Sequence, residues 1–193
     1  MKSARTTLAA ALALAFCGAA FAQAGTVQRD ANQQQRIEQG LQSGSLNTRE
    51  AARLEGEESR VQRDQARAMQ DGKLSPAEKA RLSREQNRVS RDIDREKHDA
   101  QTGNPGSASS QRMQADVQRN INQQNRIEQG VQSGSLTTRE AGRLERGEAH
   151  DSRLQARAGA DGQVSAKEQR RVQKSEKRES QRIRREKHDA QHK

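Results

Sequence analysis

The chain of 193 residues has almost none of the residue types that supply rings or thiols. It contains one Cys, two Phe, no Trp and no Tyr, and Phe16, Cys17 and Phe21 all lie in the first 22 residues. Once that segment is removed, the rest has no thiol and no aromatic ring except histidine. This excludes disulfides, thiolate metal sites, cysteine nucleophiles and aromatic platforms on which nucleic-acid bases stack.

Large aliphatic side chains are scarce as well. Residues 23–193 hold 22 Val, Ile, Leu and Met, while the formal net charge is +10. Such a composition borders on that of disordered proteins and leaves little material for a dry pocket. The sequence also lacks a nucleophile elbow, a phosphate-binding glycine loop and a His-Glu-x-x-His pair. We therefore expect a protein that is not an enzyme.

The first 22 residues have the pattern of a secretory signal peptide. Lys2 and Arg5 precede an apolar run over residues 8–20, and Ala20-Phe21-Ala22 places small residues where a signal peptidase cleaves. The run is too short to span about 30 Å of hydrocarbon. We expect cleavage after Ala22 and a periplasmic or secreted mature protein with no transmembrane segment.

The remainder of the sequence is an internal duplication. Residues 27–101 align without a gap to residues 117–191 at an offset of 90, and 44 of the 75 positions are identical. Two tandem homologous modules are therefore expected, joined by residues 102–116. Gly, Ser and Pro dominate the start of that segment, which predicts a flexible linker.

The composition favours helix throughout both modules. Ala, Arg, Gln, Glu and Lys dominate, and the two Pro residues are Pro76 and Pro105. We expect an all-α fold with three helices per module, over residues 27–41, 48–70 and 76–100 in the first. Their apolar stripes are narrow, have the heptad-like spacing of coiled coils and are interrupted by Gln and Glu. Such stripes predict a marginal helical assembly that is completed by self-association or by a partner.

Helix starts are marked by capping boxes. Asn47 is followed three residues later by Glu50, and Ser75 by Pro76 and then Glu78. The second module repeats the pattern with Thr137 and Glu140, and with Ser165 and Glu168.

Two turns have the spacing of a known calcium motif. Two others carry a fainter version of it, with Gly44, Leu46 and Glu50 in the first module and Gly134, Leu136 and Glu140 in the second. The residues of the first two turns are Asp71, Gly72, Leu74, Ser75 and Glu78, and Asp161, Gly162, Val164, Ser165 and Glu168. Each set resembles the second half of an EF-hand loop, and the resemblance implies a calcium site with ligands from Asp71, Ser75, Glu78, Asp161, Ser165 and Glu168. The earlier ligand positions depart from the motif, because Arg67 and Met69 stand there in the first turn. Helix capping accounts for the same residues without an ion.

A second resemblance rests on a shorter element. Leu136-Thr137-Thr138-Arg139-Glu140, and Leu46 to Glu50 in the first module, are similar to the Leu-Thr-x-x-Gln element of the small helical periplasmic stress proteins related to Spy and CpxP. Those proteins are exported, basic and without catalytic residues, and some shield unfolded clients. The resemblance implies an envelope or stress-related binding role.

The excess positive charge lies in the second module. Residues 27–101 contain 15 Lys and Arg against 14 Asp and Glu, whereas residues 117–191 contain 17 against 11. The cations expected to be exposed on the last helix are Arg170, Arg171, Lys174, Lys177, Arg178, Arg182, Arg184 and Arg185. Such a surface attracts an anionic envelope component or an unfolded acidic protein, and the alternative is a solvated helix face of Glu and Arg pairs. Nucleic acid is disfavoured because the protein is exported and carries no recognised binding module.

The histidines offer one further metal pattern. His188 and His192 are four residues apart and share a helix face, where with Asp189 they form a weak candidate for copper or nickel. The first module has Thr102 at the position of His192, so the pair is not part of the repeat. The sequence thus predicts a cofactor-free exported interaction protein, with a calcium-binding protein built on EF-hand-like pairs as the alternative.

Overall fold

A computed structural model describes the backbone of residues 9–189 and the side chains of residues 24–189. Within the described backbone all regular structure is helical, in six helices. The helices are α1 (Ala9–Ser43), α2 (Thr48–Ala68), α3 (Pro76–Lys97), α4 (Ala108–Gln132), α5 (Thr138–Ala158) and α6 (Ala166–Lys187). The all-α prediction is confirmed. Searched over the described residues, no helix is long and apolar enough to cross a membrane.

The predicted capping boxes are all present. At Asn47, Ser75, Thr137 and Ser165 the cap side chain accepts from the N3 backbone N–H, and the N3 glutamate accepts from the cap backbone. Each box satisfies amide groups that the first helical turn leaves without partners. The turns before these helices are made by Gly44, Gly72, Gly134 and Gly162, which have positive φ values between 73° and 89°. Glycine alone adopts that backbone without strain.

Several predicted boundaries differ from the structure. Helix α1, expected over residues 27–41, runs from Ala9 to Ser43. Helix α2 ends at Ala68 and α3 at Lys97, a few residues before the predicted ends. The expected flexible linker reaches only to Ser107, which caps α4 through a hydrogen bond from the Ser110 backbone N–H. The connection before it packs on the α1–α2 turn, where Gly103 N donates to Gly44 O at 2.8 Å. The predicted signal peptide coincides with the first part of α1 from Ala9 onward, and residues 1–8 lie outside the described residues.

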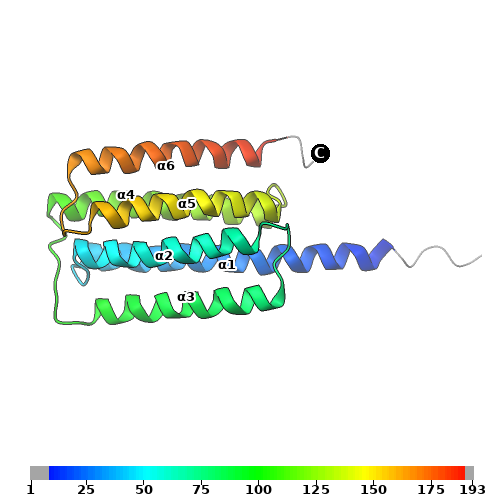
Figure 1. The fold of residues 1–193 in the computed structure, drawn as a ribbon, viewed down its shortest axis with the longest axis horizontal. Coiled ribbons are helices and arrows are strands. Elements are labelled where there is room, and N and C mark those ends of the chain that lie inside the picture. The colour runs from blue at the N-terminus through cyan, green and yellow to red at the C-terminus, as the bar shows by residue number, and fades with distance from the viewer. Residues whose placement is uncertain (1–8, 190–193) are drawn as a thin grey trace, which may run out of the picture.

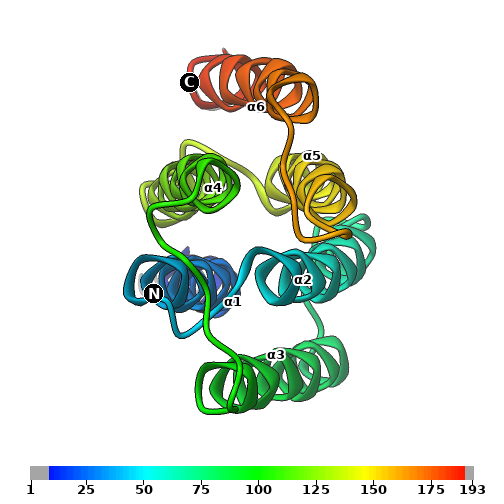
Figure 2. The ribbon, with the colours of Figure 1, turned by 90° about the vertical axis from the view of Figure 1, so that its left-hand side faces the viewer.

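The helices form four layers (Figures 1 and 2). Helices α1 and α2 form one inner layer and α4 and α5 the other, while α3 and α6 cover the two outer sides. The most extensive contacts join α2 to α5 and α1 to α4, which belong to different copies of the repeat. The inner four helices thus form a bundle shared by residues 27–101, the first copy, and residues 117–191, the second copy.

Contacts between the copies are reciprocal. Arg49 donates to the backbone carbonyl of Asp161 at 2.9 Å, and its counterpart Arg139 donates to the carbonyl of Asp71 at 3.4 Å. Ser59 Oγ donates to the carbonyl of Ala149, its own counterpart at the offset of 90. This is the contact pattern of a two-fold interface, here formed within one chain.

The two copies also share their apolar core. Of the 22 large aliphatics in residues 23–193, 21 are buried, and Leu74 is half-buried. One apolar cluster contains Ile37 and Leu54 together with Met113 and Val117 of the second copy's side of the bundle. The narrow stripe of each copy is therefore covered by the other copy, which explains how so few aliphatic residues form a core.

Candidate functional site

The outer helix α6 presents one continuous basic surface. Its eight predicted cations are all exposed, as expected: Arg170, Arg171, Lys174, Lys177, Arg178, Arg182, Arg184 and Arg185. We call these eight residues the basic face. Arg182 forms an ion pair with Glu179 at 3.0 Å. None of the other seven forms an ion pair with a residue that the structure describes, and all seven are exposed.

The first copy has only part of this surface. Helix α3 occupies the matching outer layer, yet it carries Ala80, Asn87, Asp92 and Asp94 where α6 carries Arg170, Lys177, Arg182 and Arg184. The other four positions hold exposed arginines in α3 as well, namely Arg81, Arg84, Arg88 and Arg95. The full set of eight cations is thus a property of the second copy, whereas the fold that displays it is common to both.

Carboxylates are distributed in the opposite way. Thirteen of the chain's 26 Asp and Glu side chains are buried, and no Lys, Arg or His is buried among the side chains of residues 24–189. The buried acids are Asp30, Glu50, Glu55, Glu58, Glu96, Asp116, Glu128, Glu140, Glu145, Glu148, Asp151, Glu176 and Glu179. Acids inside and bases outside are an unusual arrangement, because a buried ionised carboxylate is costly.

The deepest of these acids lie on α2 and α5, where the two copies meet. Burial raises the pKa of Glu58, Glu145 and Glu148 well above the ordinary value, and neighbouring carboxylates raise these pKa values further. Both oxygens of Glu58 and both oxygens of its counterpart Glu148 are buried without a hydrogen-bond partner. Burial therefore favours the uncharged form of these groups.

Each copy also has one buried acid that accepts a hydrogen bond from a glutamine amide of α2 or α5. In the first copy Asp30 accepts from Gln65 at 2.6 Å and from Gln86 at 2.7 Å. In the second copy the acid is Glu176, which accepts from Gln155 at 3.1 Å, while Asn120 stands at the position of Asp30. Burial raises the pKa of Asp30 to about 7 and that of Glu176 to about 9. Each copy thus has one acid in this group of buried polar residues, but Asp30 aligns with Asn120, and Glu176 aligns with Gln86.

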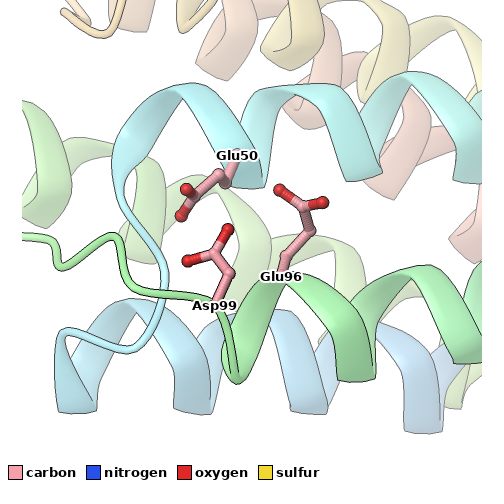
Figure 3. A group of neighbouring side chains, drawn as sticks. All are labelled: Glu50, Glu96 and Asp99. Carbon is pink, nitrogen blue, oxygen red and sulfur yellow. The ribbon is translucent and has the colours of Figure 1, made fainter.

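Three further carboxylates converge at one end of the first copy (Figure 3). Glu50 is at the N3 position of α2, Glu96 is in the last turn of α3, and Asp99 follows that helix. One oxygen from each lies within 4.8 Å of the other two. We call this group the acidic triad. Burial raises the pKa of Glu50, and the charges of Asp99 and Glu96 raise it further.

The second copy repeats the acidic triad with Glu140, Glu186 and Asp189. These three residues are the counterparts of Glu50, Glu96 and Asp99 at the offset of 90, and one oxygen of each again lies within 4.8 Å of the other two. The sequence pattern placed Glu50 and Glu140 in capping boxes, in the fainter EF-hand-like turns and in the Leu-Thr-x-x-Gln-like element, and it did not predict either triad. A signal was available: residues 95–101 and 185–191 are identical, whereas the helices before them have diverged.

The EF-hand-like turns use their polar groups internally. Asp71 Oδ1 accepts from the Lys73 backbone N–H at 2.9 Å, and Ser75 Oγ donates to Glu78 Oε2 at 2.6 Å. Asp161 accepts from the Gln163 backbone in the same way, and Ser165 donates to Glu168. Asp71, Ser75, Asp161 and Ser165 are exposed, whereas Glu78 and Glu168 are half-buried. Calcium binding by them stays a prediction.

The histidine pattern falls partly outside the described residues. His188 is the exposed C-cap of α6, where its backbone N–H donates to Arg185 O, and His192 lies beyond the described part of the chain. In the first copy the His98 ring contacts the Asp94 carbonyl through Nδ1 at 2.7 Å.

No protein-family model, no curated protein and no solved structure matches this chain.

Proposed function

We propose that this protein is an exported, non-enzymatic interaction protein that binds an anionic envelope component through the basic face of α6. The observation that supports this most directly is the separation of charge described above. Half of the carboxylates are buried in the bundle, whereas no cation among the described side chains is buried.

The buried acids also bear on the charge of the protein. The formal net charge of +10 counts every carboxylate as ionised. Burial raises the pKa values of Glu58, Glu145, Glu148 and Glu176, which favours the uncharged form of these four groups and therefore a net charge above the formal count. A long-range field of this sign draws anions toward the molecule.

The chemistry of the surface favours a phosphate-bearing partner over an unfolded protein. Six of the eight members of the basic face are Arg, whose planar guanidinium pairs with phosphate in bidentate fashion. The large aliphatic residues among the described side chains are buried apart from the half-buried Leu74, so the folded surface offers little apolar area to a client. Anionic lipid headgroups, including the phosphates of lipopolysaccharide, are the partner class that we propose.

The test is sedimentation of the mature chain with anionic vesicles, and with neutral vesicles as the reference. One variant combines Arg170→Ala, Lys177→Asn and Arg184→Asp, which places on α6 the residues that α3 carries at the same positions. Since each surface cation near an anionic membrane contributes about 1 kcal/mol, this variant should bind roughly 100-fold more weakly at low salt.

A matched control makes the same chemical changes on α3. The substitutions Lys79→Ala, Arg84→Asn and Arg91→Asp also remove three exposed cations and add one acid. We expect this control to keep most of the affinity for anionic vesicles. Equal loss in both variants would mean that net charge alone drives binding, and wild-type binding that does not weaken with salt would refute an electrostatic partner.

A further inference from the structure

We propose that each acidic triad, Glu50, Glu96 and Asp99 in the first copy and Glu140, Glu186 and Asp189 in the second, binds a hard divalent cation of the calcium class. The proposal does not depend on anion binding by α6, because no triad residue belongs to the basic face, although Glu186 follows Arg185 directly on α6. It also shares no residue with the EF-hand-like turns that begin at Asp71 and Asp161.

The geometry of the first triad suits a shared ion. The three carboxylates come from two helices and the segment after α3, and Figure 3 shows them turned toward one another. Oxygens within 4.8 Å of one another can contact a common Ca²⁺, whose oxygen ligands lie at about 2.3–2.6 Å.

A buried oxygen without a partner points to a ligand at this place. Glu50 is 5% exposed, and its Oε2 accepts from the Asn47 backbone N–H at 2.9 Å. Its other oxygen, Oε1, is buried and has no hydrogen-bond partner. Helix capping requires the first oxygen only. A cation in the triad would give the second oxygen the partner that a buried carboxylate oxygen requires.

Two arginines lie beside the first triad, and both form ion pairs with the same carboxylate. Glu96 forms ion pairs with Arg53 and, at 3.8 Å, with Arg95, whereas Glu50 and Asp99 form none with the residues that the structure describes. Asp99 accepts from the backbone and side chain of Gln101. Glu96 and Asp99 also lie at the C-terminal end of α3, where the helix dipole opposes anions and favours cations.

The ligand set selects the class of ion. All six triad residues offer carboxylate oxygens, which suit hard cations and not copper or zinc. Asp99 is exposed, so water can complete the six to eight oxygen ligands that Ca²⁺ takes. An ion in the first triad would join the first turn of α2 to the end of α3, and an ion in the second would join the first turn of α5 to the end of α6. Each ion would thereby stabilise the packing of an outer helix on the bundle.

The experiment is calorimetric titration of the mature chain with CaCl₂, with MgCl₂ and ZnCl₂ as the other ions. We expect two calcium ions per chain with submillimolar affinity, and a melting temperature that rises with calcium. Asp99→Asn should lower the stoichiometry to one ion, and adding Asp189→Asn should abolish binding. Asparagine keeps an oxygen that can accept from the residue 101 backbone, so both variants should retain the fold.

The control variant tests the turns. Asp71→Asn with Asp161→Asn removes the acid of each EF-hand-like turn and should leave both calcium ions bound. If calcium causes neither heat nor a shift in melting temperature up to about 1 mM, the weak end of known extracellular calcium modules, the proposal is wrong. It is also wrong if the turn variant loses binding while the Asp99→Asn, Asp189→Asn variant keeps it.

Discussion

The buried carboxylates predict that this protein becomes less stable as the pH rises through neutrality, and Glu55 provides the sharpest case. Its side chain is 0% exposed on α2, and Gln34 donates to its Oε2 at 3.1 Å. Burial raises its pKa from 4.5 to about 7, although the amide of Gln34 and the hydroxyl of Ser152 lower it in part. The perturbation that we propose is Glu55→Gln, which keeps the shape and removes the titration.

The sign and size follow from linkage. Because the pKa is higher in the folded state, the stability that Glu55 contributes is full below pH 4.5 and is lost as the pH rises to about 7. A difference of about 2.5 units corresponds to about 3 kcal/mol in the free energy of unfolding. For a chain of this length that is a fall of roughly 6–12 °C in melting temperature. Asp30, Asp116 and Glu179, whose pKa values burial also raises to about 7, act in the same direction.

The assay is thermal unfolding followed by circular dichroism between pH 4.5 and 8. The wild type should lose stability across this range, and Glu55→Gln should lose about 3 kcal/mol less. Asp71→Asn, which changes an exposed acid, should follow the wild type. A wild-type melting temperature that stays constant or increases over this range would refute the reasoning, as would a Glu55→Gln variant with the wild-type slope.

Two further outcomes concern packing and capping. Leu144→Ala opens a cavity in an apolar cluster that contains Val27 and Met69 of the first copy's side. It should lower the free energy of unfolding by about 2–5 kcal/mol, and the whole chain should still unfold in one cooperative transition. Separate transitions for the two copies would contradict a shared core. Ser165→Ala removes the hydroxyl that accepts from the Glu168 backbone N–H, so it should lower the free energy of unfolding by about 1 kcal/mol in denaturant. Ser165→Asp should lose much less stability, because Asp also caps helices. Equal losses in the two variants would contradict a capping role.

The helix starts could be predicted from the sequence because a capping box depends only on residues close together in the chain. The capping boxes at Asn47 and Ser75 need only residues three positions apart, and both are present. The start of α4 was missed for the same reason. Ser107 caps that helix with Ser110 at the third position, so the glutamate that marks the other starts is absent.

The buried acids could not be predicted from the sequence. Gln34, Glu58 and Gln65 fall on the apolar stripes and look like interruptions, yet all three are fully buried. Their environment is created by the other copy of the repeat, whose position depends on tertiary packing. The acidic triads were missed because Glu50 and Asp99 are 49 positions apart and meet only when α3 folds back along α2.

The claim that the basic face of α6 is the binding surface is tested most directly by hydrogen exchange of the mature chain with and without anionic vesicles. We expect added vesicles to slow amide exchange in α6, and to leave exchange in the equivalent outer helix α3 unchanged. Equal protection of α3 and α6, or protection of α3 alone, would contradict the account.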